Sequence, residues 1–406
     1  MSSRLGFRAT LNCSYAAYIV QAAVNNIAPI LYIIMVREFD LSLGEVAFLM
    51  SFNFAVQICV DAFGAGFTDR IGYRPCTVAA HFFAFAGLLG LGLFPYLFRN
   101  AFAGILLATV FYAIGGGLIE VLVSPIVEAL PSEHKSGAMS ILHSFYCWGQ
   151  LSVVLLSTLF LVTVGESYWF LIPAIWSLLP LVNAFLFLFV PIRHLSESHE
   201  KASVGSLFGM KIFWMMMVLM LCGGASELSM SQWASLFAEL GLQVSKTVGD
   251  LLGPSMFALL MGVSRVFYGK FCERIDLRRY ILGSAMLCVV SYLVCVFAPW
   301  PIVSLLGCAV CGLSVGIMWP GTLSLAAERC PAGNTAIFAI LALCGDAGCS
   351  LGPAVVGAVS AGVKGSFLSF EGEAAGLHAG LLCVVIFPAV MAVTAFILGR
   401  MKKKSR

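Results

Sequence analysis

Charged residues are scarce in this sequence. Asp, Glu, Lys and Arg make up 11% of its 406 residues and 60% are apolar, whereas a soluble globular domain is roughly one quarter charged. This scarcity excludes an ordinary soluble protein. The chain has no nucleotide-binding glycine loop and no nucleophile elbow, so we do not expect an enzyme. Its net charge is only +3, which gives no indication of a nucleic-acid partner, and we expect none.

Twelve apolar runs account for most of the chain. Each is long enough to cross a hydrocarbon core of about 30 Å, which takes about 20 helical residues. The expected spans are 9–36, 44–68, 75–97, 101–127, 136–163, 167–191, 208–238, 247–270, 280–299, 302–327, 334–362 and 376–399. The first run is too long for the core of a signal peptide and has no convincing cleavage site, so we expect it to remain as a helix. The sequence therefore predicts an all-α membrane protein.

The lysines and arginines predict the orientation. Most of the 23 fall in the termini and in the loops on one side of the expected bilayer, and such loops are typically cytoplasmic. We expect a monomeric, multi-pass protein of the cell (cytoplasmic) membrane, with both termini in the cytoplasm. One long polar interval, 192–207, separates six spans from six. The expected domains are therefore 1–191, a cytoplasmic loop 192–207, and 208–406.

The fourteen cysteines do not indicate a metal or redox site. Nearly all lie within expected spans, where cysteine typically serves as a small apolar side chain. Cys308 and Cys311 have a metal-type spacing, but no second cluster or histidine accompanies them. We therefore expect no metal site and no cofactor, and no disulfides within the spans.

Short polar motifs recur between the two halves. "GFTDRIGYR" at 66–74, between the second and third spans, returns as "KFCERIDLR" at 270–278, between the eighth and ninth. "EALP" at 128–131 returns as "ERCP" at 328–331, at the ends of the fourth and tenth spans. The two offsets are similar, which indicates two parallel six-helix halves.

The first motif resembles the signature loop of the major facilitator superfamily of transporters. That loop carries a Gly, an Asp-Arg and a Gly-x-Arg between helices two and three. Here Ala65 replaces the usual first glycine, and the second copy has Glu273 for Asp and Asp276 for the later glycine. The resemblance covers the whole chain. It implies twelve helices in two pseudo-symmetric halves that work by alternating access.

The charges of these loops form a candidate conformational latch. An aspartate beside arginines at helix ends can make charge-assisted hydrogen bonds to the neighbouring half. The alternative is that these charges only set the orientation of the helices in the membrane. The expected latch residues are Asp69, Arg70, Arg74, Glu273 and Arg274, with Arg265 and Asp346 as further members. The partner of Arg265 is left open among Asp61, Glu120 and Asp346. We favour an ion pair between the halves over direct solute binding.

A finer resemblance is to the fucose–proton symporter branch of the superfamily. It is carried by "GGGLIEVLVSPIVEALP" at 115–131, "LHSFYCWGQ" at 142–150 and "GGASELSMSQW" at 223–233. In that branch a carboxylate on helix four serves coupling or substrate binding, and Glu120 occupies the matching position. The branch also uses an aspartate on helix one, where this sequence has Asn25 and Asn26.

Ionisable side chains within the spans are costly and need a partner or a function. Helical rise places Glu120 about 12 Å and His143 about 10 Å from the inner ends of adjacent spans, so the two could meet and exchange a proton near neutral pH. A static hydrogen bond between helices is the alternative. The candidates for proton coupling are Glu120, Glu227 and Asp61, and an outer-gate hydrogen bond is the alternative for Glu227.

Neutral polar residues lie on one face of the first span and one face of the second. Tyr18, Gln21 and Asn25 are spaced i, i+3, i+7, and such a face should turn away from lipid. The expected solute ligands are Tyr18, Gln21, Asn25, Asn26, Glu120, His143, Gln150, Glu227, Trp233 and Trp319. Amides and aromatic rings suit a hydroxyl-rich ring, and packing is the alternative role for the tryptophans.

These features together predict the class of solute. Apart from Lys211 at the inner end of the seventh, only the eighth span carries a Lys or Arg, which argues against an organic-anion carrier. We expect a transporter that takes up a neutral sugar-like or polyol solute together with a proton and binds the solute between its halves. Its expected partners are the lipid bilayer, protons and this small-molecule solute. The alternatives are a proton-driven exporter of amphipathic compounds, although the fifth span lacks the Gly-Pro motif of drug–proton antiporters, and a non-transporting receptor.

Overall fold

The computed structural model describes residues 6–131, 135–192, 208–271, 275–329, 334–363 and 365–400. Within these ranges it leaves undescribed the side chains of 64–67, 69, 128, 135–140, 327–328 and 334–339. Twelve helical segments of the described chain are long and apolar enough to cross a membrane. The predicted all-α membrane protein with twelve spans is therefore confirmed. The chain divides into two compact units, Met1–Glu197 (unit 1) and Ser198–Arg406 (unit 2).

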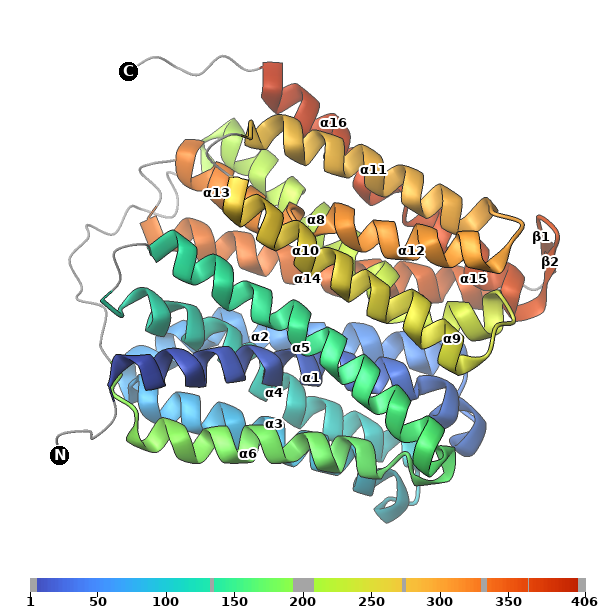
Figure 1. The fold of residues 1–406 in the computed structure, drawn as a ribbon, viewed down its shortest axis with the longest axis horizontal. Helices are drawn as coiled ribbons and strands as arrows, with labels where there is room; N and C mark the ends of the chain where they lie inside the picture. Colours follow the sequence, from blue (N-terminus) through green and yellow to red (C-terminus); the bar gives the residue numbers. More distant parts are fainter. Residues whose placement is uncertain are drawn as a thin grey trace. The chain divides into compact units, whose positions relative to one another are not determined.

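Unit 1 contains the first six spans as continuous helices (Figure 1). Its elements are α1 (Phe7–Phe39), α2 (Leu43–Ile71), α3 (Tyr73–Leu97), α4 (Ala101–Glu128), α5 (Lys135–Val164), the 3₁₀ turn η1 (Glu166–Tyr168) and α6 (Leu171–Phe189). Helix α3 packs against α4 and α6, and α1 packs against α4, α5 and α6. Residues 20–35 of α1 are buried, so α1 is the central helix of this unit.

A single residue joins α2 to α3 in the first signature loop. Gly72 has φ 97° and ψ 155°, a conformation almost exclusive to glycine that costs a residue with a Cβ about 1–3 kcal/mol. Its N–H donates to the carbonyl of Thr68 at 2.8 Å, and Cys76 donates to the Gly72 carbonyl at 3.4 Å. The glycine of the motif thus ends one helix and begins the next without an intervening loop.

Three consecutive glycines allow α4 to approach three other helices. Added Cβ atoms would lie 2.5 Å from Ala84 N in α3 for Gly115, 3.0 Å from a Val24 methyl in α1 for Gly116, and 3.1 Å from Val60 Cβ in α2 for Gly117. Small residues permit such close packing in lipid. Because Glu120 follows one turn later on α4, the glycines place its carboxyl group beside α1.

Unit 2 contains the other six spans, and four of these are interrupted (Figure 1). Its elements are α8 (Lys211–Leu236), the π-helix η2 (Phe237–Gly241), α9 (Lys246–Asp250), the π-helix η3 (Leu251–Ser255), α10 (Met256–Phe271), α11 (Leu277–Phe297), α12 (Pro301–Val315), α13 (Met318–Arg329), α14 (Asn334–Gly362), β1 (Ser366–Phe367), β2 (Phe370–Glu371), α15 (Gly372–Cys383) and α16 (Ile386–Arg400). The seventh, eighth, tenth and twelfth spans were expected to be continuous. The short antiparallel hairpin β1–β2 was not expected.

In the second signature loop an aspartate, not a glycine, precedes the next helix, α11. Asp276 occupies the position of Gly72, and its carboxylate accepts from the backbone N–H groups of Arg278 and Arg279 at 3.1 and 3.4 Å. Aspartate is among the preferred N-cap residues because it satisfies these otherwise unpaired donors. The departure from the glycine pattern therefore replaces a turn residue with a helix cap.

Candidate functional site

Three buried amides form a hydrogen-bonded cluster between α1 and α2. The side-chain oxygen of Asn25 accepts from Asn53 at 3.1 Å and from Gln57 at 2.9 Å, and Gln57 also donates to the oxygen of Asn53 at 3.1 Å. Each of the three side chains is buried. The polar faces expected on the first two spans thus turn toward each other, and their donors and acceptors are matched within the unit.

Glu120 contacts the same face of α1. The amide nitrogen of Gln21 donates to a carboxylate oxygen of Glu120, and Gln21 is 4% exposed. Gln21 lies one turn before Asn25 on α1, so the carboxylate and the amide cluster share a helix face. The structure therefore brings together two of the predicted solute ligands that the sequence analysis had not paired.

Aromatic and hydroxyl groups extend this region toward α5. The Tyr18 hydroxyl hydrogen-bonds with the Ser124 hydroxyl at 2.9 Å, and the ring of Tyr18 meets the ring of His143 edge-on, with centroids 5.1 Å apart. The Asn26 amide donates to the Tyr146 hydroxyl at 3.3 Å and to the Ala22 carbonyl at 2.9 Å. Gln150 of α5 is buried as well. The pairing of Glu120 with His143 stays a prediction.

A buried ion pair joins α8 to α10 in unit 2. The guanidinium of Arg265 lies 3.6 Å from a carboxylate oxygen of Glu227, and both side chains are about 10% exposed. Sequence analysis did not propose Glu227 as a partner of Arg265, because spacing along the chain does not show that α8 and α10 bring the two together. A buried arginine requires a counter-charge of this kind.

The two predicted tryptophans pack against α14. Trp233 is fully buried, and its indole N–H donates to the carbonyl of Pro353 at 3.2 Å. The ring of Trp319 lies so close to Gly345 that an added Cβ there would be 2.3 Å from it. These contacts favour the packing alternative for Trp233, whereas Trp319 is partly exposed.

Residues 14–353 match the sequence family described as the Major Facilitator Superfamily. The chain belongs to this superfamily. Its members are membrane transporters, so the protein is an integral multi-pass transporter of small-molecule solutes rather than an enzyme. The predicted superfamily and fold are thus confirmed.

Several relatives within the superfamily resemble this chain. The membrane protein MosC of Rhizobium meliloti is 23% identical over 296 residues, which are 73% of this chain and 68% of MosC. The crystal structure of a D-xylose–proton symporter has a TM-score of 0.79 at 14% identity and covers 98% of this chain and 99% of its own. The structure of the transporter FucP in the outward conformation has a TM-score of 0.67 at 14% identity, covering 96% of this chain and 99% of its own. At these identities the structures show a shared fold.

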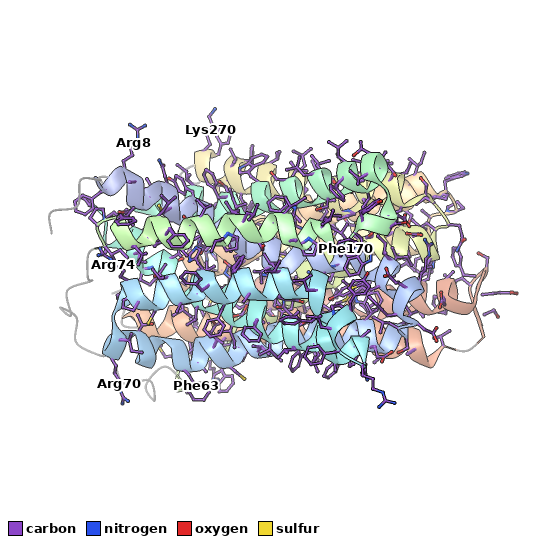
Figure 2. The ribbon with its side chains drawn as sticks, turned by 90° about the horizontal axis from the view of Figure 1, so that it is seen from below. Arg8, Phe63, Arg70, Arg74, Phe170 and Lys270 are labelled. Atoms are coloured by element: carbon purple, nitrogen blue, oxygen red, sulfur yellow. The ribbon has the colours of Figure 1, made fainter. Side chains whose placement is uncertain are left out.

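The superfamily's signature loop is described only in part. Arg74 donates to the carbonyl of Val190, the C-cap residue after α6, at 2.8 Å, and a cation there is favoured by the helix dipole. Arg70 is exposed, and Figure 2 shows Arg8, Arg70 and Arg74 at the same end of unit 1. Glu273, Arg274 and the side chain of Asp69 lie outside the described part, so the latch stays a prediction.

The remaining predicted acids, Asp61 and Asp346, lie on α2 and α14. Asp61 is on α2, two turns before the signature loop, and is half-buried, whereas Asp346 on α14 is 4% exposed. A coupling role for Asp61 stays a prediction, as does a latch role for Asp346.

Two polar clusters were not predicted from the sequence. Asp250 is fully buried and lies 2.9 Å from the ammonium of Lys246. Ser235 also donates to Asp250. In unit 1 the carboxylate of Glu38 accepts from the Tyr96 hydroxyl and from the Trp169 indole N–H. The spacing Lys246–Asp250, one helical turn, was the available signal for the first cluster.

Proposed function

We propose that this transporter takes up a neutral, hydroxyl-rich solute of the sugar or polyol class together with a proton. The observation that carries the proposal is the contact of Glu120 with Gln21, beside the cluster of Asn25, Asn53 and Gln57. A carboxylate inside a span is costly and therefore indicates a function, and Glu120 is the carboxylate that contacts this face of α1. It is our first choice for the coupling residue.

The chemistry around Glu120 favours a neutral solute. Amides offer both donors and acceptors, which suits hydroxyl groups that need both, and the ring of Tyr18 can pack against the apolar face of a sugar ring. The described lysines and arginines of unit 1 lie at or near the ends of its helices, so in the described part of this unit no cation lies at the depth of the amide cluster to select a carboxylate or phosphate. In this proposal the ligands within unit 1 are Tyr18, Gln21, Asn25, Asn26, Glu120, His143 and Gln150. Glu227 and Trp319 of unit 2 stay predicted solute ligands.

Two relatives by fold transport solutes of this kind according to their names, a D-xylose–proton symporter and the fucose–proton symporter of E. coli. A nucleoside transporter is also similar in fold, so the fold alone does not select the solute. We further propose that the protein is a monomer in the cell membrane. We propose that both termini are cytoplasmic because Arg8, Arg70 and Arg74 share one end of unit 1 and positive charge favours the cytoplasmic side.

Reconstituted liposomes test the proposed function. Purified protein is screened for counterflow of labelled sugars and polyols, which needs no proton gradient, and each hit is repeated as net uptake with an inward proton gradient. We expect counterflow of at least one such solute and stimulation of its net uptake by the gradient. The matched control for Glu120→Gln is Glu166→Gln, which neutralises an exposed carboxylate 4.0 Å from Arg37.

Three results would contradict the proposal. Absence of counterflow for every sugar and polyol would overturn the solute class, and extrusion of an amphipathic dye would then favour an exporter. Binding without flux would indicate a receptor. Stimulation by the gradient that Glu120→Gln leaves intact would remove Glu120 as the coupling residue and direct attention to Glu227 or Asp61.

A further inference from the structure

The tenth span is broken at a carbonyl that its own helix cannot satisfy. Helix α12 ends at Val315 and α13 begins at Met318. Helical hydrogen bonds are intact on both sides, from Gly316 N to Gly312 O at 3.2 Å and from Gly321 N to Ile317 O at 2.7 Å. Between them, the residue that should donate to the Gly316 carbonyl is Pro320, which has no N–H. In a membrane such a carbonyl must find another donor.

Arg265 of α10 supplies that donor. Its Nε lies 3.3 Å from the Gly316 carbonyl oxygen, and the side chain is buried. The approach depends on a glycine, because a Cβ at residue 316 would lie 2.7 Å from Ser264 Cβ and 2.9 Å from the Met261 carbonyl. A cation at the C-terminal end of α12 is also favoured by the helix dipole.

The same guanidinium is paired with Glu227. Its Nη2 lies 3.6 Å from the carboxylate, while Nε faces the Gly316 carbonyl, and the planar fork of arginine can serve two acceptors in this way. Glu227, Arg265 and Gly316 thus form a continuous polar contact through the seventh, eighth and tenth spans. The break in the tenth span is therefore held by a side chain whose position depends on a carboxylate of another span.

We propose that Arg265 is a positioning residue that makes the bend of the tenth span depend on the charge of Glu227. With Glu227 ionised, the guanidinium is shared between the carboxylate and the carbonyl. When a proton neutralises Glu227, the guanidinium is no longer drawn toward that carboxylate, and its hydrogen bond to the Gly316 carbonyl strengthens. This inference rests on the proposed proton-coupled transport, in which Glu227 is a candidate for carrying the proton.

Other titratable groups surround this part of α8. Arg265 of α10 and Tyr292 of α11 contact α8 directly. Helices α14 and α12 pack against α8 and carry Asp346, Cys349, Cys308 and Cys311, and α13 and α16, which also pack against it, carry Arg329 and Arg400 at their ends. The Tyr292 hydroxyl donates to the Ser226 carbonyl next to Glu227, and Asp346 adjoins Gly345, whose carbonyl contacts α8. Asp346→Asn therefore belongs among the variants. If this substitution changed the pH dependence of solute uptake and Glu227→Gln did not, Asp346 and not Glu227 would be the titrating group.

The first test removes the Arg265 donor and then gives the Gly316 carbonyl a backbone donor in its place. Arg265→Lys keeps the charge beside Glu227 but lacks the planar fork, and Pro320→Ala gives the Gly316 carbonyl a donor from its own helix. We expect Arg265→Lys to lower the maximal rate of solute uptake about ten-fold with little change in KM, the effect of one buried hydrogen bond. Adding Pro320→Ala should recover the rate. Pro353→Ala, within α14, is the matched proline control and should not recover it.

A second readout does not require a solute. Spin labels carried by an unnatural ketone amino acid at the exposed positions Leu306 and Ser324 report the bend, since 18 residues of unbroken helix span about 27 Å. We expect the distance to change in Arg265→Lys and in Glu227→Gln and to become insensitive to both in the Pro320→Ala background. This measurement separates the inference from the proposed function, whose failure would appear as absence of flux in the unaltered protein. An unchanged distance in Arg265→Lys, or equal recovery by Pro353→Ala, would overturn the inference.

Discussion

A single glycine on α14 offers a quantitative test of the packing in unit 2. Gly348 is so close to α8 that an added Cβ would lie 2.0 Å from the Leu221 carbonyl oxygen and 2.9 Å from the backbone nitrogen of Ala225. These are backbone atoms of a buried helix, so they cannot rotate away, and Gly348→Ala requires the helices to separate by about 1 Å. Overpacking of this kind costs about 1–3 kcal/mol.

The matched control is Gly283→Ala on α11. Gly283 is also inside a helix, but nothing lies within 4 Å of an added Cβ, so the substitution should stabilise the helix by about 0.5–1 kcal/mol. In a unit of this size about 1 kcal/mol shifts Tm by about 2–4 °C. In thermal unfolding of the purified protein we expect Gly348→Ala to lower Tm by about 2–12 °C and Gly283→Ala to raise it by about 1–4 °C. Equal shifts for the two variants would refute the close contact between α8 and α14.

Three further predictions concern the signature loops and the amide cluster. Gly72→Ala should destabilise the protein by about 1–3 kcal/mol because φ at this position is 97°. Gly44→Ala should not, because an added Cβ there would meet only Ser42 Oγ, at an ordinary contact distance of 3.8 Å; equal Tm values for the two variants would contradict this. Asp276→Ala should lower the free energy of unfolding by about 1 kcal/mol because it removes the N-cap of α11, and Asp276→Asn should lower it much less. Equal decreases for the two variants in thermal unfolding would exclude the cap as the cause. Asn25→Leu removes the acceptor of two buried amides and should weaken solute binding at least about ten-fold, more than Asn25→Asp, as measured by equilibrium binding; unchanged affinity would remove the cluster from the site.

The spans could be predicted from the sequence because lipid imposes length and hydropathy on every crossing helix. The interruptions could not be predicted in this way, since Gly316 and Pro320 lie within a long apolar window and do not change its mean hydropathy. The available signal was their spacing of four, which removes one helical hydrogen bond. Asp276 was noted as a departure from the motif, although aspartate before a helix is also an N-cap signal.

The sequence predicted which polar residues share a helix face better than which of them contact each other. Helical spacing indicated that Tyr18, Gln21 and Asn25 share one face, and the structure confirms hydrogen bonds from this face to α2 and α4. Depth along the helices suggested His143 for Glu120, whereas the contact with Gln21 depends on how closely α4 approaches α1 at Gly116. Such lateral distances are set by packing, which residue spacing along one helix does not contain.

The most direct test of the central claim is solute-induced proton movement. Liposomes containing the protein are suspended in weakly buffered medium without a gradient, and the external pH is recorded when a transported solute is added. The account predicts alkalinisation of the medium for the unaltered protein and for Glu166→Gln, and none for Glu120→Gln, although counterflow persists in that variant. Solute entry without a change of pH in the unaltered protein, or undiminished alkalinisation in Glu120→Gln, would contradict proton coupling through Glu120.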